Sequence, residues 1–348
     1  MTNTIIVTGG AGFIGSNFVH LMIDRGFRVV TLDALTYSGN ITNLADLREH
    51  PAHRFVHGSI TDQHLVRELF REEKPAAMLN LAAESHVDRS IDYPGAFIET
   101  NILGVYQLLE TIRTDLDSLP EKFRFLHVST DEVFGSILEG AATEDSPFCP
   151  NSPYAASKAS AGHLVRAYHR TYGLPVLLSN CSNNYGPCQF PEKLIPLMIL
   201  NALKGRPLPV YGDGRHVRDW LYVGDHCEAL SIVLEKGRFG QTYNIGGNAL
   251  MTNLEIVKKI CIILDRKKPS PDGPYERLIT HVEDRPGHDF RYSLECGKIE
   301  RELKWKPSIG LDEGLEKTVI WYLDRKDWWH EIDSQIYDGE RLGLSTTS

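Results

Sequence analysis

The stretch that decides the fold reads Thr4-Ile5-Ile6-Val7-Thr8-Gly9-Gly10-Ala11-Gly12-Phe13-Ile14-Gly15. Its apolar run predicts a short buried strand, and the helical spacing over Phe13–Asp24 predicts a helix directly after the glycines. Glycine permits a tight turn and a close approach of backbone to a pyrophosphate, whose charge the N–H groups of the helix start can bind. Two glycine spacings fit, one through Gly9, Gly12 and Gly15 and a shorter one from Gly10. The stretch therefore predicts a dinucleotide site.

Further apolar runs alternate with helical patterns at Arg28–Asp33, 54–57, 77–81 and 124–129. Near-continuous apolar strands between helices are typical of a doubly wound parallel sheet, the Rossmann-type α/β fold. We expect this domain to span about residues 1–184 and to carry the catalytic residues. Proline and glycine punctuate 186–196 and 205–214, which predicts a smaller mixed α/β substrate-binding region over about 185–330. The stretch from about Trp328, including a tail over 331–348, is expected to be peripheral.

Composition excludes several classes of protein. The 348 residues are 42% hydrophobic and 24% charged, and the net charge of -9 argues against nucleic acid or an anionic membrane as partner. The six cysteines form no CxxC pair and the fourteen histidines no HExxH spacing, so neither disulfides nor a metal are predicted. No basic leader and no run of about 20 apolar residues is present. A cytoplasmic protein is expected.

Asp33 identifies the expected cofactor. It ends the second predicted strand 18 residues beyond Gly15, where a carboxylate can bind the hydroxyls of the adenosine ribose. Ala34 and Leu35 follow and supply no cation for a 2′-phosphate. NAD is therefore predicted rather than NADP.

A second constellation predicts the chemistry. Tyr154 and Lys158 lie four residues apart at the start of a predicted helix, so they share one face. An adjacent ammonium would lower the tyrosine pKa from ~10 and let the phenol act as a base. Thr130 ends the preceding strand and is followed by Asp131 and Glu132. Adjacent carboxyls can serve as separate acid and base if their environments hold their pKa values apart.

These residues resemble the extended short-chain dehydrogenase/reductase family, whose triad is Ser or Thr, Tyr and Lys. Longer strings, in order from about residue 3 to 325, are similar to the dTDP-glucose 4,6-dehydratase family within it. The strings are DALTYSGN (33–40), AAESHVDRS (82–90), STDEVFG (129–135), NNYGP (183–187), FPEKLIP (190–196), RDWLYV (218–223) and DRPGHD (284–289).

The resemblance implies conversion of dTDP-glucose to dTDP-4-keto-6-deoxyglucose and water, as in deoxysugar biosynthesis. Tyr154 would take the C4 hydroxyl proton while hydride passes to NAD. Glu132 would remove the C5 proton, and protonated Asp131 would give a proton to the leaving C6 hydroxyl. Thr130 would bind near the sugar O4, and hydride would return to C6. The reaction is redox-neutral, so retained NAD is expected.

Other ligands are also carried over from the resemblance. The implied NAD contacts are Gly9, Gly12, Phe13, Ile14, Gly15, Asp33, Thr36, Ser59, Ile60, Ala82, Ala83, Thr100, Tyr154 and Lys158. The implied substrate contacts are Ser85, Thr130, Asn184, Lys193, Leu194, Arg218, Asn253, Arg285 and His288. Ser59 stands where relatives often have an aspartate against the adenine, which puts NAD affinity in question.

Several alternatives stay open at this point. UDP- or CDP-glucose could replace dTDP-glucose, because base selection rests on a few contacts. A nucleotide-sugar C4 epimerase or decarboxylase shares the glycine loop, the tyrosine and the lysine, but needs no Asp-Glu pair. A catalytically silent NAD-binding protein is the remaining possibility. The resemblance also implies a homodimer, with the helices near 100–114 and 154–172 as candidates for its interface.

Overall fold

The computed structural model describes residues 3–335 and side chains as far as His330. Its main sheet has seven parallel strands in the order β10-β6-β5-β4-β1-β2-β3. The strands are β1 Thr4–Thr8, β2 Arg28–Asp33, β3 His53–His57, β4 Ala77–Asn80, β5 Arg124–Thr130, β6 Val176–Cys181 and β10 Thr242–Ile245. The order reverses direction at β1, which leaves a crevice at the carboxyl ends of β1 and β4. The predicted doubly wound sheet is confirmed.

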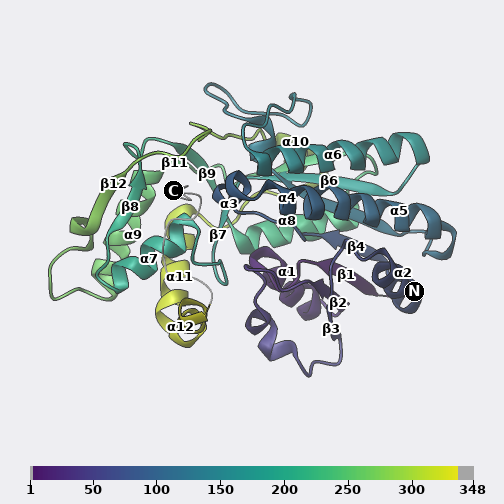
Figure 1. Ribbon diagram of the computed structural model, residues 1–348, viewed down its shortest axis with the longest axis horizontal. Coiled ribbons are helices and arrows are strands. Elements are labelled where there is room, and N and C mark those ends of the chain that lie inside the picture. The colour runs from purple at the N-terminus through teal and green to yellow at the C-terminus, as the bar shows by residue number, and fades with distance from the viewer. Residues whose placement is uncertain (1–2, 336–348) are drawn as a thin grey trace.

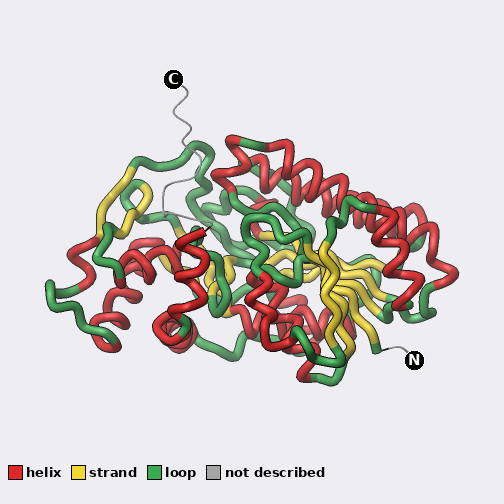
Figure 2. Tube along the Cα trace, turned by 60° about the horizontal axis from the view of Figure 1, so that its bottom comes forward, coloured by secondary structure: helices red, strands yellow, loops and turns green. Residues whose placement is uncertain are grey.

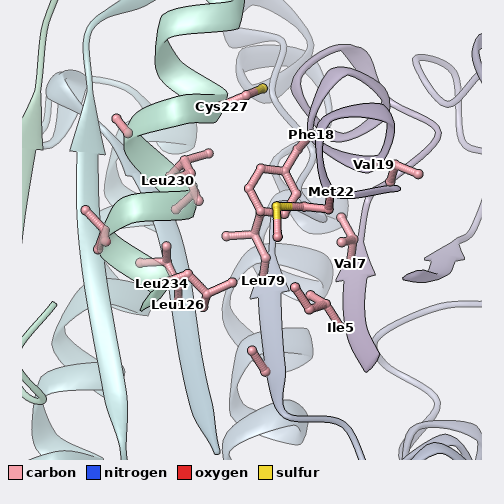
Figure 3. Close-up of a cluster of buried hydrophobic side chains, with 14 of the residues drawn as sticks. Ile5, Val7, Phe18, Val19, Met22, Leu79, Leu126, Cys227, Leu230 and Leu234 are labelled. Carbon is pink, nitrogen blue, oxygen red and sulfur yellow. The ribbon is translucent and has the colours of Figure 1, made fainter. Parts of the chain in front are cut away.

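Helices cover both faces of this sheet (Figure 2). On one face lie α1 Phe13–Asp24 and α8 Val223–Lys236; on the other lie α2 Gln63–Glu73, α5 Val105–Asp115 and α6 Pro153–Tyr172. In Figure 3, Phe18 and Met22 of α1 face Leu79 of β4, and Leu230 of α8 packs nearby. Because both faces are covered, the strands are apolar on both sides.

Short helical segments connect these elements. They are η1 Ile41–Leu47, α3 Val87–Asp92, α4 Pro94–Phe97, η2 Ile98–Gly104, η3 Leu116–Ser118 and η4 Asp131–Phe134. The segment η2 is a π-helix that runs directly into α5. No helix among residues 3–335 is both long enough and apolar enough to pass through a bilayer.

A second unit lies beside the carboxyl ends of the sheet (Figure 1). It contains the sheets β11-β9-β7 and β12-β8, with strands β7 Asn183–Tyr185, β8 Leu208–Tyr211, β9 Val217–Tyr222, β11 Leu250–Thr252 and β12 Ile279–Val282. Its helices are α7 Leu194–Leu203, α9 Asn253–Lys267, η5 Tyr275–Leu278, α11 Leu311–Asp324 and α12 Lys326–Gln335. A separate apolar core holds these elements together.

The chain departs from the predicted division at residues 184/185. β10 pairs in parallel with β6, and α8 packs on α1, so residues 223–245 return to the main sheet. The helix α10 Gly297–Leu303 packs on the same side through Ile299. The stretch around Trp328 is also not peripheral, because Trp329 is buried in the core of the second unit. From residue 336 onward, the predicted tail lies outside the residues that the structure describes.

Candidate active site

A cavity of about 320 Å³ opens at the carboxyl ends of the parallel strands. All fourteen predicted NAD contacts line it, as do Asp131 and Glu132. Of the predicted substrate contacts it includes Ser85, Thr130, Asn184 and Lys193. Residues up to 184 positions apart in the sequence, Gly9 and Lys193, therefore share one pocket, as expected where ligands bind such sheets.

The glycine loop has the geometry that its sequence predicts. Gly9 has φ +70°, and a Cβ there would lie 2.7 Å from the backbone nitrogen of Ala82. A Cβ on Gly15 would lie 2.1 Å from the carbonyl oxygen of Gly9. Gly12 caps the start of α1 without any side-chain cap. The loop therefore presents bare backbone and a helix N-terminus to the cavity, which fits the pyrophosphate of a dinucleotide.

Asp33 lines the same cavity next to this loop. Its Oδ2 accepts a hydrogen bond from the Ala11 N–H at 2.9 Å, and its Oδ1 accepts one from the Leu35 N–H at 2.8 Å. Burial raises its pKa, while the two backbone donors lower it. Each oxygen keeps a lone pair for a ribose hydroxyl. The fit supports NAD, since Ala34 and Ser38 also line this end and neither is cationic.

Ser59 and Ile60, which are predicted to contact NAD, both line the cavity. The Ser59 hydroxyl is already engaged in its own turn, at 2.8 Å from Thr61 Oγ1, and accepts from the Thr61 N–H at 3.1 Å. A serine held this way can offer at most one further contact to a ring edge.

Tyr154 and Lys158 lie on the first turns of α6 and are both buried. The Lys158 Nζ donates to the carbonyl oxygen of Val128 at 2.7 Å, and burial lowers the pKa of Lys158 to about 8. The pKa of Tyr154 is raised, first by burial and then by Glu132, although a hydrogen bond with Thr130 lowers it. The expectation of a lowered tyrosine pKa is therefore wrong for the protein by itself, because burial of the phenol and the nearby Glu132 raise this pKa.

Asp131 and Glu132 form the first turn of η4, which Thr130 caps by accepting from the Glu132 N–H at 3.3 Å. Burial and the neighbouring Glu132 hold the pKa of Asp131 well above its usual range. Burial also raises the pKa of Glu132, but three cations, Arg285, Lys193 and Arg218, act in the opposite direction. The two carboxyls thus occupy different electrostatic environments, as separate acid and base roles require.

The predicted substrate cations come from the second unit. Arg218 is buried on β9 and donates to the carbonyl oxygens of Asp289 (2.8 Å) and Val217 (2.8 Å). Arg285 donates to Asp88 Oδ1 at 3.3 Å. Because both act on the pKa of Glu132, they lie on the catalytic side of the unit although they do not line the cavity itself.

Three other predicted substrate residues also lie outside the lining of the cavity. Leu194 begins α7 directly after Lys193, and Asn253 begins α9 with its N–H donating to the His216 carbonyl oxygen at 2.9 Å. His288 hydrogen-bonds Asp284 Oδ1 at 2.6 Å and stacks on His216 at 3.8 Å. Asn253 and His288 both contact His216, directly before β9, so the predicted substrate residues fall into one group that lines the cavity and one group outside its lining.

Among the described residues, His216, Asp284 and His288 form the one group of three or more His, Cys, Asp or Glu side chains whose ligand atoms all lie within 4.8 Å of one another. The two imidazole planes are nearly parallel, at 16°, and stacked. Parallel stacked rings cannot both direct a nitrogen lone pair at one ion in the tetrahedral arrangement typical of zinc.

Sequence reasoning missed Glu192 as a site residue. Its side chain is buried, lines the cavity and accepts from the Tyr37 hydroxyl at 3.2 Å, and burial raises its pKa to about 7. Tyr292 was missed as well: Arg218 lies over its ring at 4.3 Å. The position of Glu192 inside the string 190–196, directly before Lys193, was the available signal.

Comparison with known proteins gives one consistent result. The family described as GDP-mannose 4,6 dehydratase matches residues 6–318. A dTDP-glucose 4,6-dehydratase of Xanthomonas campestris pv. campestris (strain B100) is 56% identical, with 98% of this chain and 99% of the relative covered. One from Escherichia coli is 49% identical, with 98% and 99% covered.

Solved structures agree with the sequence relatives. The dTDP-glucose 4,6-dehydratase DesIV of Streptomyces venezuelae, with NAD and dTDP bound, superposes with a TM-score of 0.87 at 47% identity, covering 94% of this chain and 99% of that one. A UDP-glucose 4-epimerase of Thermotoga maritima gives 0.83 at 29% identity, covering 92% and 99%. The family match over residues 6–318 and the relatives of about 50% identity over nearly the whole chain lead to one conclusion: the chain belongs to the GDP-mannose 4,6 dehydratase family of nucleotide-sugar enzymes.

Proposed function

We propose that this chain is an NAD-dependent lyase that converts dTDP-glucose to dTDP-4-keto-6-deoxyglucose and water. The observation that carries the proposal is the buried pair Asp131 and Glu132, held in different electrostatic environments beside Tyr154. The relatives named for this reaction, at 49–56% identity, support it.

The cofactor site is formed by the chain's own backbone and Asp33. Bound NAD would supply a cationic nicotinamide that takes two electrons from the sugar at C4 and gives them back at C6. Tyr154 takes the proton of the C4 hydroxyl, and Thr130 supports it through the hydrogen bond between their hydroxyls. Lys158 lies one helical turn after Tyr154, and its ammonium is oriented by the hydrogen bond that it donates to the Val128 carbonyl oxygen. A cationic ligand ring beside Tyr154 would offset the raised pKa of the phenol.

Elimination of water needs an acid and a base at neighbouring carbons. Glu132 faces Arg285, Lys193 and Arg218, which favour its ionised form, so it removes the C5 proton. Burial and Glu132 raise the pKa of Asp131 well above its usual range, which favours its protonated form, so it gives its proton to the leaving C6 oxygen.

The substrate contacts are proposed as a group. They are Ser85, Thr130, Asn184, Lys193, Leu194, Arg218, Asn253, Arg285 and His288. The two arginines suit a diphosphate, because a guanidinium binds two oxygens at once. In a protein with net charge -9 they also provide the local positive potential that such a ligand requires.

The test is incubation of the protein and NAD with dTDP-, UDP- or CDP-glucose in parallel, followed by mass spectrometry. A product lighter by one water, formed fastest from dTDP-glucose, is expected. A product of unchanged mass would indicate an epimerase. This is the main alternative function, because the fold also matches the UDP-glucose 4-epimerase of Thermotoga maritima with a TM-score of 0.83. Loss of carbon dioxide or no turnover would equally overturn the proposal.

We also propose a cytoplasmic homodimer that assembles through the faces of η2, α5 and α6. Apolar side chains project from this surface, with Ile98, Leu103, Tyr106 and Tyr172 all exposed. Exposed apolar side chains that gather on neighbouring helices are typical of protein–protein interfaces. All six cysteines are free thiols, which suits a reducing compartment.

A further inference from the structure

Trp328 connects the C-terminal helix α12 to the NAD-binding half of the molecule. Its indole Nε1 donates to Asn43 Oδ1 at 2.7 Å, across 285 positions of sequence. Asn43 belongs to η1 and is only 6% exposed. Loss of the Trp328 donor would leave the buried Asn43 Oδ1 without this hydrogen bond, and an unsatisfied buried acceptor is destabilising.

The side-chain amide nitrogen of Asn43 contacts the glycine loop. Its Nδ2 donates to the carbonyl oxygen of Ala11 at 2.9 Å, and the Asn40 N–H donates to the same oxygen at 3.1 Å. The Ala11 N–H in turn donates to Asp33 Oδ2 at 2.9 Å. Ala11 of the loop is therefore held at its N–H by the Asp33 carboxylate and at its carbonyl by the Asn43 amide, to which Trp328 donates.

The Trp328 side chain is itself held in place by aromatic contacts. The Trp328 ring packs at 4.9 Å from Trp321 and 6.1 Å from Tyr322, both on α11. The Tyr322 hydroxyl donates to the Gln189 carbonyl oxygen, and Gln189 lines the cavity. In Figure 1 the yellow helices α11 and α12 lie between α7 and the half that carries the main sheet. The helix pair thus holds two loops that line the cavity.

We propose that Trp328 is a positioning residue for the cofactor loop, which acts through Asn43 and Ala11 to slow the release of NAD. The proposal rests on the proposed function, in which the cofactor is regenerated in each cycle and retention is useful. Without the indole donor, Asn43 loses one of its two fixed contacts, and the glycine loop can open without first breaking its tie to α12. The effect is expected on release of NAD rather than on the chemical steps.

The experiment compares two indole deletions that keep an aromatic ring. Trp328→Phe removes the bond to Asn43. Trp329→Phe is the matched control, because the Trp329 indole donates to the Tyr322 carbonyl oxygen at 2.9 Å, inside the same helix pair. Each protein is loaded with radiolabelled NAD and diluted into excess unlabelled NAD, and loss of label is followed. Trp328→Phe should release NAD about 2- to 10-fold faster than wild type, the range for one hydrogen bond, and Trp329→Phe at the wild-type rate.

A double-mutant cycle with Asn43→Ala tests whether Trp328 acts through Asn43 or whether its substitution destabilises the surrounding structure in general. The double variant should release NAD no faster than Asn43→Ala alone, because both changes interrupt one path. Multiplicative effects, or equal rates for Trp328→Phe and Trp329→Phe, would overturn the proposal. Wild type that fails to retain NAD would instead refute the proposed function. Unfolding temperatures of the NAD-free proteins show whether a change in rate reflects loss of the fold.

Discussion

Asp131→Asn gives the sharpest test of the assigned chemistry. The side chain is buried, its pKa is held well above the usual range, and the Thr130 hydroxyl donates to its Oδ1 at 3.3 Å. Asparagine has the same shape, keeps an Oδ1 acceptor and is neutral, as the protonated aspartic acid is. The substitution therefore removes a transferable proton and leaves the charge around Tyr154 and Glu132 nearly unchanged.

The expected magnitude follows from these features. Positioned general acids contribute about 10²- to 10⁴-fold to a rate, so elimination should slow by about 3–5 kcal/mol of barrier. Oxidation at C4 depends on Tyr154 and should change by less than about 3-fold, since a neutral group replaces a neutral group. The C4-oxidised, undehydrated sugar should therefore accumulate together with NADH.

The assay is rapid mixing with dTDP-glucose, with NADH absorbance for oxidation and quench-flow mass spectrometry for loss of water. In deuterated water, Asp131→Asn should still exchange the C5 proton, because Glu132 remains, whereas the control Glu132→Gln should not. Equal slowing of oxidation and elimination in Asp131→Asn would refute the assignment of roles. So would a variant with wild-type elimination.

Three further predictions follow from individual residues. Gly15→Ala should abolish NAD binding and lower the free energy of unfolding by about 1–3 kcal/mol, because its Cβ would lie 2.1 Å from the Gly9 carbonyl; Gly95→Ala, with open space around it, is the control in calorimetry. Glu192→Gln should flatten the pH dependence of stability. Because the pKa of Glu192 is about 7 in the folded state and 4.5 in the unfolded state, the wild type loses at most about 3 kcal/mol of its free energy of unfolding as the pH rises from 4.5 through 7. If thermal melts of the NAD-free variant showed the same pH dependence as the wild type, this prediction would be contradicted. Leu103→Asp (50% exposed) should give monomers by light scattering, whereas Leu138→Asp (68% exposed, on a loop) should not; a dimer in both variants would place the interface elsewhere.

The first half of the fold follows closely from local sequence. The helix Phe13–Asp24 and the strand Arg28–Asp33 have the predicted bounds, and the other strands differ by one residue at an end. Apolar runs buried on both faces and a glycine loop are local signals, so periodicity suffices to read them. The return of β10 to pair with β6 is a long-range event, and no local pattern marks it.

The site divides in the same way. The glycine loop, Asp33, Thr130, Tyr154 and Lys158 line one cavity as their spacing predicts. Glu192 escaped notice because a single glutamate is common on surfaces, and only burial makes it distinctive. The direction of the Tyr154 pKa shift was also predicted wrongly, since a spacing of four residues brings Lys158 to the same helix face but does not reveal the burial of the phenol or its proximity to Glu132.

The sequence by itself determined the dinucleotide loop, the choice of cofactor and the presence of an acid-base pair, because each depends on residue types at short spacing. Only the tertiary structure placed these two carboxyls in different electrostatic environments. Asp131 and Glu132 are neighbours in the chain, and Arg218 of β9 lowers the pKa of both, yet Lys193 and Arg285 lower that of Glu132, while Glu132 raises that of Asp131. Charges from distant parts of the chain set a pKa through space, and the order of residues along the chain does not encode that distance.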